Sequence, residues 1–141
     1  MRTLLSINLP ARIENLGRFM NPVSECARAQ GFDQRKISEI ELATEEALVN
    51  IFNYSYPEKP GDVEINCKME NGRFIIEIID SGIPFDITSL ADPDITSDIA
   101  KRKIGGLGVF FTKQMMDEVR YRRENDRNIL ELIIRKEEDK W

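Results

Sequence analysis

Three polar side chains share one strip of a predicted helix in the first half of the chain. Glu46 and Asn50 are four positions apart and Asn53 follows three positions later, within EEALVNIFNYSY. At helical periodicity the three fall on one face, at the border of the apolar face. A carboxylate beside an amide oxygen could be a general base next to a magnesium ligand, because Mg²⁺ favours a few hard oxygen ligands. A solvated helix flank explains the same spacing, so both interpretations stay open.

A second polar group stands where a strongly apolar run ends. Asp80 follows the run IIEII, and Ser81-Gly82 then turns the chain. A carboxylate at a strand end can accept a hydrogen bond from the amino group of a nucleobase. A glycine there would let the flat base lie against the backbone. An Asp-Ser-Gly turn that binds nothing is the alternative.

A third group is rich in glycine and opens a helical-looking run. Gly105, Gly106, Leu107 and Gly108 form the tetrapeptide GGLG, which follows the basic run KRK that ends at Lys103. Backbone amides at a helix N-terminus are a ready site for phosphate, and the basic run could neutralise phosphate charge. A tight turn into a helix, with a solvated basic run before it, would also account for these residues.

Strands and helices must position these groups, and the apolar periodicity predicts them in a definite order. The predicted elements are a strand over 2–9 stopped by Pro10, helices over 11–30 and 33–56, a hairpin over 62–80, a long polar loop, a helix over Val109–Asp117, and a hairpin over 118–136 that turns near Asn125 to Asn128. Strands joined mainly by hairpins predict an α+β fold, a two-layer sandwich with a mixed, mostly antiparallel sheet and helices on one face.

Local signals refine three of these elements. Pro22 predicts a kink or a break near Asn21 in the first helix, because proline lacks the helical N–H. Asp33 is the expected N-cap of the second helix, which Pro57 should end. Asn71-Gly72 is the strongest short-range hairpin signal in the chain.

Composition limits the classes of function. The 141 residues predict one domain over 1–141, and their net charge of −5 argues against a direct nucleic-acid binder. No apolar window approaches the roughly 20 residues of a membrane span. The absence of histidine excludes Ser-His-Asp catalysis and nearly every zinc arrangement. Cys26 and Cys67 lack metal-ligand spacing, so we expect reduced thiols in a cytoplasmic protein.

Taken together, the motifs resemble a known family. EEALVNIFNYSY, DSGIPFD and GGLGVFFTKQMMDEV are similar to the N, G1 and G2 boxes of the ATP-binding fold that gyrase, MutL and the histidine kinases share. IELATEEALVN, the FD after Asp-x-Gly, MDEV and YRRENDRNILELIIRK resemble the bacterial anti-sigma-factor serine/threonine kinases in particular. The resemblance covers the chain from about residue 30 to 136.

The resemblance implies a role for each motif residue. Asp80 would take the adenine amino group, Gly82 would lie under the base, Asn50 would hold Mg²⁺ and Glu46 would be the general base. The loop from Thr88 to Lys103 would be an ATP lid between the G1-like and G2-like boxes. The remaining implied nucleotide-binding residues are Asn53, Lys103, Gly105, Gly106, Leu107 and Gly108.

Two positions depart from the family pattern. Tyr54 stands where many members carry a histidine at the end of the N box. Relatives often place a threonine on the last strand, where it helps to fix adenine, but the segment here reads NILELII. No residue of the second hairpin can be assigned to that contact from the sequence.

The resemblance implies an ATP- and Mg²⁺-dependent serine/threonine kinase that acts as an anti-sigma factor. Its partners would be a sigma factor and an anti-anti-sigma protein that it phosphorylates, without direct nucleic-acid or membrane binding, and it would form a homodimer. A non-catalytic module whose lid shifts with ATP and so changes its affinity for a partner remains an alternative. The ATP domain of a histidine kinase acting in trans is a third.

Overall fold

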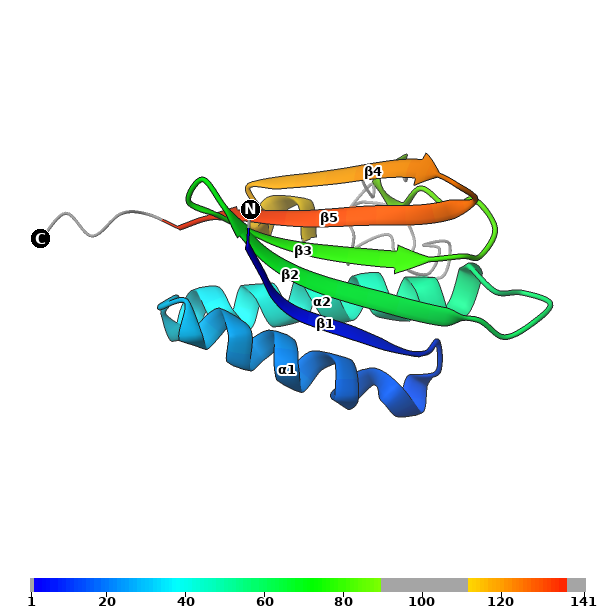
Figure 1. The fold of residues 1–141 in the computed structure, drawn as a ribbon, viewed down its shortest axis with the longest axis horizontal. Helices are drawn as coiled ribbons and strands as arrows, with labels where there is room; N and C mark the ends of the chain where they lie inside the picture. The colour runs from blue at the N-terminus through cyan, green and yellow to red at the C-terminus, as the bar shows by residue number, and fades with distance from the viewer. Residues whose placement is uncertain (1, 90–111, 137–141) are drawn as a thin grey trace, which may run out of the picture.

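The computed structural model describes residues 2–89 and 112–136. Within them, two long helices lie against one face of a five-stranded sheet (Figure 1). The elements in chain order are β1 (Arg2–Pro10), the 3₁₀ helix η1 (Ile13–Asn15), α1 (Leu16–Ala29), α2 (Gln34–Tyr54), β2 (Asp62–Glu70), β3 (Arg73–Asp80), the 3₁₀ helix η2 (Ile87–Ser89), β4 (Glu118–Glu124) and β5 (Arg127–Arg135). The predicted two-layer α+β fold is confirmed.

The order of the strands brings distant parts of the chain together. The sheet runs β1-β2-β3-β5-β4, and every described pairing is antiparallel, so the expected mixture of directions does not occur in this part of the chain. The pairing of β3 with β5 places Asp80 directly opposite Asn128. The chemistry expected at the end of β3 therefore has a neighbour from the last strand.

Both hairpins turn through residues in the left-handed region. Asn71 and Gly72 have φ of 51° and 75°, and Asn125 and Asp126 have φ of 53° and 60°. Two consecutive residues with positive φ suit a two-residue turn whose twist matches that of the strands. The second turn is shorter than predicted, because β5 already begins before Asn128.

The helices follow the sequence signals with one exception. The Asp33 carboxylate caps α2 by accepting a hydrogen bond from the Lys36 amide at 2.8 Å, as predicted, and α2 ends three residues before Pro57. Of the kink or break predicted near Asn21, the break does not occur, since α1 continues through Pro22. Proline leaves the carbonyl four residues earlier without its helical donor, and that residue, Arg18, is exposed to water that can replace the bond.

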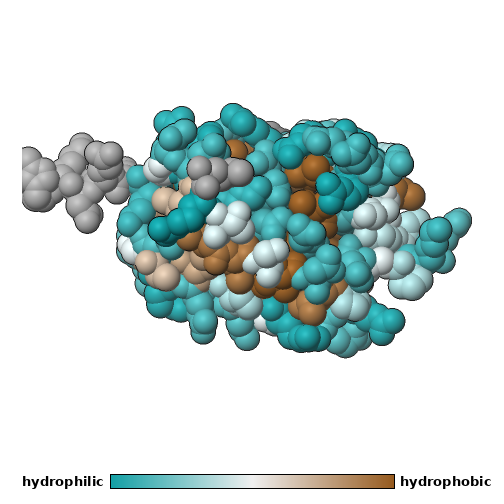
Figure 2. Space-filling view, in the orientation of Figure 1, coloured by the Kyte–Doolittle hydropathy of each residue, from teal (hydrophilic) through white to brown (hydrophobic). Residues whose placement is uncertain are grey.

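The core lies between the helices and the sheet. Its largest fully buried side chains include Phe19 of α1, Leu48 of α2 and Phe74 of β3. Cys67 of β2 is also fully buried and its thiol lies against that of Cys26 from α1; both cysteines are free, as expected. In the orientation of Figure 1, the molecule shows a band of apolar side chains between hydrophilic ones (Figure 2). No helix among the described residues has the length and apolarity needed to cross a bilayer.

Candidate functional site

The predicted pair on α2 is a hydrogen-bonded unit. The Asn50 side-chain nitrogen donates to the Glu46 backbone carbonyl at 2.8 Å and to the Glu46 carboxylate at 3.0 Å. Asn50 is 1% exposed, whereas Glu46 is half-buried and Asn53, one turn further, is exposed. The helix thus brings the first two residues together and leaves the third at the surface.

The oxygen of the Asn50 side-chain amide differs from the nitrogen in its hydrogen bonding. The oxygen is buried and has no hydrogen-bond partner within the described residues. Leaving a buried acceptor unpaired costs about 1–3 kcal/mol, so such an atom calls for a partner such as a water molecule or an ion. The two bonds on the nitrogen fix the amide so that this oxygen is the free atom. One hard oxygen with a carboxylate beside it fits Mg²⁺, which takes its other ligands from water and phosphates.

Asp80 lies at the end of β3, as predicted, and is buried. Its exposed fraction is 2%, and its Oδ1 accepts hydrogen bonds from the Gly82 amide and the Asn128 side-chain nitrogen, each at 2.9 Å. Burial raises the pKa of this carboxyl, while the bonds from Asn128 and Gly82 and the charge of Arg123 act in the opposite direction. The hydroxyl of Ser55, which is also buried, lies beside the carboxylate and acts in the same direction as these bonds, lowering the pKa.

Gly82 is required by the approach of another backbone. A Cβ atom at this position would lie 2.1 Å from the carbonyl oxygen of Ser55, at the end of α2. The same carbonyl accepts a hydrogen bond from the Ile83 amide at 2.9 Å. The segment after Asp80 is therefore held against the end of α2 by this hydrogen bond and by close backbone packing. That a nucleobase lies against Gly82 stays a prediction.

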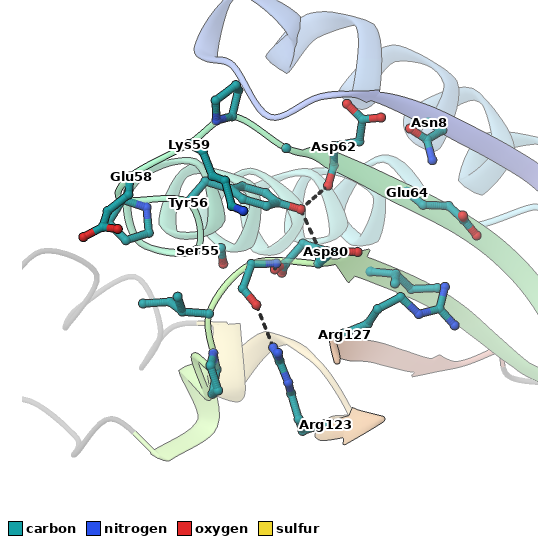
Figure 3. A pocket seen from close by; sticks show the side chains of 18 residues that line it. Asn8, Ser55, Tyr56, Glu58, Lys59, Asp62, Glu64, Asp80, Arg123 and Arg127 are labelled. Atoms are coloured by element: carbon teal, nitrogen blue, oxygen red, sulfur yellow. Dashed lines mark hydrogen bonds between the residues drawn. The ribbon is translucent and has the colours of Figure 1, made fainter. Parts of the chain in front are cut away.

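Two further side chains hold the turn at 80–83 from opposite sides (Figure 3). The Tyr56 hydroxyl accepts a hydrogen bond from the Ser81 amide at 2.7 Å and donates to the Asp62 carbonyl at 2.6 Å. Arg123 of β4 donates to the Gly82 carbonyl at 2.8 Å. The turn is thus connected to the start of β2 and to the last hairpin. This fixes the direction of the Asp80 carboxylate before any ligand binds.

Two cavities meet at Asp80. An open cleft of about 900 Å³ lies on one side, with Tyr56, Lys59, Ile79, Arg123 and Arg127 among its lining residues (Figure 3). A much smaller apolar cavity lies among α2, β5 and the segment after Gly82, lined by Ile51, Asp80, Phe85, Ile87, Tyr121, Asn128 and Leu130. The cleft contains neither Glu46 nor Asn50. Neither does the small cavity, although it is lined by Ile51, the residue that follows Asn50 in α2.

The remaining predicted site residues lie outside the described residues. They are Lys103, Gly105, Gly106, Leu107 and Gly108, together with the predicted lid beyond Ser89. The predicted helix over Val109–Asp117 is described only from residue 112, where helical structure extends to residue 115. The phosphate-binding role of the glycines stays a prediction.

Sequence reasoning missed Asn128 and Tyr56. Asn128 is 3% exposed and contacts Asp80, 48 positions away. An asparagine in an otherwise apolar strand is a weak signal, since this residue type is depleted in strands. Tyr56 gave no signal, because it is simply the last aromatic residue of the predicted helix before Pro57.

A glycine-to-alanine pair tests the packing at the turn. We expect Gly82→Ala to lower the free energy of unfolding by about 1–3 kcal/mol or more, because the new methyl group would collide with the Ser55 backbone. Gly17→Ala in α1 is the matched control: nothing lies within 4 Å of its added Cβ, and removing a helical glycine should stabilise by roughly 0.5–1 kcal/mol. Urea unfolding measures both. Equal stability of the two variants would refute the close approach.

Most of the chain matches a known family. The model of the histidine kinase-like ATPase domain matches residues 9–134, which include Glu46, Asn50 and Asp80. In its solved structure, the Acinetobacter baumannii histidine kinase AdeS has a similar fold, with a TM-score of 0.53 and 15% identity over 96% of this chain and 70% of that one.

Two curated proteins similar to this chain carry the same name. The serine-protein kinase RsbW of Listeria monocytogenes serovar 1/2a is 27% identical over 127 residues, which are 85% of this chain and 80% of that protein. The serine-protein kinase RsbW of Bacillus cereus strain AH820 is 24% identical over 130 residues, which are 89% of this chain and 81% of that protein.

Proposed function

The chain belongs to the histidine kinase-like ATPase domain family, and from this membership we propose that it is an ATP-dependent serine/threonine protein kinase. Similar proteins named serine-protein kinase match along most of its length. The observation that carries the proposal is the buried side-chain oxygen of Asn50, which has no hydrogen-bond partner among the described residues and whose amide Glu46 holds in place. It is the arrangement that a domain needs to hold a magnesium-bound triphosphate.

Each described site residue has one task in this proposal. Asp80 accepts the adenine amino group through a carboxylate whose direction the turn at 80–83 fixes. The Asn50 oxygen would hold Mg²⁺, which when bound offsets the charge that develops on the transferred phosphoryl group. Glu46 lies beside Asn50 and can take the proton of an acceptor hydroxyl, provided that the hydroxyl reaches hydrogen-bond distance. The glycines 105, 106 and 108, the Leu107 amide and Lys103 would bind the phosphates.

The regulatory part of the proposal rests on the resemblance in the sequence. We propose that the chain, one domain over 1–141, is a cytoplasmic anti-sigma factor that binds a sigma factor in one state. In the other state it phosphorylates a serine or threonine of an anti-anti-sigma partner. The net charge of −5 agrees with a protein that meets other proteins rather than nucleic acid directly.

We also propose that two copies associate. β1 is an edge strand of the sheet, so its outer N–H and C=O groups are available to a second chain. The other edge strand, β4, carries a run of charged side chains, EVRYRRE, which discourages strand pairing. The apolar band of Figure 2 offers further surface. Light scattering in solution would measure the mass of the assembly.

Phosphotransfer from labelled Mg-ATP tests the kinase. The acceptors are the small anti-anti-sigma-type proteins of the same organism, and mass spectrometry reads the modified residue. We expect phosphoserine or phosphothreonine with the natural chain and none with Asn50→Ala, because that variant lacks the metal-binding oxygen. Asn21→Ala, an exposed asparagine of α1, is the matched control and should transfer normally.

The same experiment separates the two functions. ATP binding without transfer to any acceptor would favour a nucleotide-gated binding module that acts by differential affinity for its partner. Transfer at the natural rate by Asn50→Ala would contradict the assignment of the metal ligand. In either case a binding measurement with ATP, made alongside, shows whether nucleotide was held.

A further inference from the structure

The Asn128 side chain is saturated with hydrogen bonds. Its nitrogen donates to the Asp80 carboxylate at 2.9 Å and to the Ile83 carbonyl at 2.8 Å. Its oxygen accepts from the Phe85 amide at 3.2 Å and from the Tyr121 hydroxyl at 2.5 Å. An asparagine amide has two N–H donors and one oxygen with two lone pairs, so all its bonding capacity is used. At 3% exposure it is a buried connection rather than a surface contact.

These bonds set which Asp80 oxygen a ligand can use. The bonds from Asn128 and from the Gly82 amide both end on Oδ1. Oδ2 is then the carboxylate oxygen that can receive an N–H from a ligand, with the Ser55 hydroxyl beside the group. The other three bonds of Asn128 tie the segment after Gly82 and β4 to the same point. A rotation of the Asp80 carboxylate would break the bonds that Asn128 and the Gly82 amide donate to Oδ1.

We propose that Asn128 is a positioning residue for nucleobase recognition, which holds the Asp80 carboxylate so that one of its oxygens is presented to the base. This inference deepens the proposed function, because it assumes that Asp80 reads the amino group of adenine. Asn128 needs no contact with the nucleotide to act in this way.

The pKa of the Asp80 carboxyl should depend on Asn128, and this dependence can be measured. Burial raises the pKa of this carboxyl, and the Asn128 bond lowers it, as do the Gly82 amide and the Arg123 charge from β4. The Ser55 hydroxyl at the end of α2 also lowers the pKa of Asp80, and the Tyr56 hydroxyl lies near the same carboxyl. Removing the Asn128 donor must therefore raise the pKa further. Only the ionised carboxylate leaves the presented oxygen free of a proton and able to accept a hydrogen bond from the base. As pH is lowered, the affinity for an amino-bearing base should therefore be lost at a higher pH than in the natural chain.

A matched pair of variants isolates the donor. Asn128→Thr and Asn128→Val have nearly the same shape, but only threonine retains a hydroxyl that can donate to Asp80. We expect Asn128→Val to bind ADP about tenfold to a hundredfold more weakly at neutral pH, as for the loss of a hydrogen bond to a charged group. The fall of affinity on acidification should move to higher pH in Asn128→Val, and Asn128→Thr should recover part of both effects.

The measurement is calorimetric titration with ADP in magnesium-free buffer across a range of pH, which keeps Asn50 out of the readout. Asn66→Val is the control, because Asn66 lies in the same sheet and donates to Glu64 and Glu77 instead. The inference would be overturned if Asn128→Val bound ADP with the affinity of the natural chain and lost that affinity at the same pH on acidification. Affinity that falls equally at every pH, with no recovery in Asn128→Thr, would also overturn it, since that outcome indicates a packing defect alone.

A second readout does not need nucleotide. The carboxyl carbon of Asp80, followed by NMR as pH is changed, reports its pKa in each variant. We expect a higher pKa in Asn128→Val than in the natural chain, and an unchanged pKa would refute the positioning role. If the natural chain binds no ADP at all, the proposed function fails, while this titration still decides whether Asn128 controls Asp80.

Discussion

Replacement of Asp80 by asparagine is expected to weaken ATP binding severely while leaving the fold at least as stable as before. The ionised carboxylate offers only acceptors, whereas an amide would present an N–H to the amino group of adenine. The loss of a hydrogen bond to a charged group predicts an affinity lower by about tenfold to a hundredfold. The two N–H donors that would then face each other, from the amide and from adenine, weaken binding further. Calorimetric titration with ATP measures the change.

The expected gain in stability comes from the raised pKa of Asp80. A buried carboxyl with a folded-state pKa above its unfolded value destabilises the native state once pH exceeds that unfolded value, and this penalty is relieved as pH falls. The neutral amide has no such penalty and can still accept from Asn128 and Gly82. Thermal unfolding at neutral pH should therefore give an equal or higher Tm. Asp62 is an exposed residue of the cleft, and as a control Asp62→Asn should change neither the ATP affinity nor the Tm. Undiminished ATP affinity in Asp80→Asn would refute the adenine contact.

Removal of the Glu46 carboxylate should separate binding from chemistry. In Glu46→Ala the bond from Asn50 to the backbone carbonyl at position 46 remains, so the metal-binding oxygen stays in place. ATP affinity should change little, while the rate of phosphotransfer should fall by about 10²–10⁴-fold, as when a general base is lost. Single-turnover transfer to the acceptor protein measures this rate.

Glu45→Ala is the control for that variant. Glu45 is the preceding residue and is exposed, so its loss removes a similar charge without touching Asn50. Its rate should be that of the natural chain. If Glu46→Ala transferred phosphate equally fast, the role of Glu46 as base would be wrong. If both variants were slow, the negative charge of the helix rather than one carboxylate would be responsible.

The features that the sequence predicted correctly depend on neighbours in the chain. The Glu46–Asn50 bond follows from helical spacing, the cap at Asp33 from the residue before an amphipathic run, and the turn at Asn71 from a dipeptide that tolerates positive φ. The position of Asp80 at a strand end follows from the apolar run before it. Each signal acts within about one turn of helix or one hairpin.

What the sequence did not predict depends on residues far apart. Asn128 reaches Asp80 only because β3 pairs with β5, which no local pattern specifies. Tyr56 is connected to Ser81 across the end of the sheet. The break predicted near Asn21 fails for a different reason: Pro22 removes only one helical hydrogen bond, at the exposed residue Arg18, and the helix continues.

The two cysteines have a practical consequence for following ligand binding by fluorescence. Burial raises the pKa of both thiols, so each is less ionised at neutral pH than a free cysteine and reacts slowly with maleimide dyes. A single cysteine introduced at an exposed position, such as Ser81→Cys beside the carboxylate, would therefore be labelled selectively in the otherwise natural chain. The native thiols can remain in place, and the packing between α1 and β2 need not be disturbed to obtain a site-specific reporter.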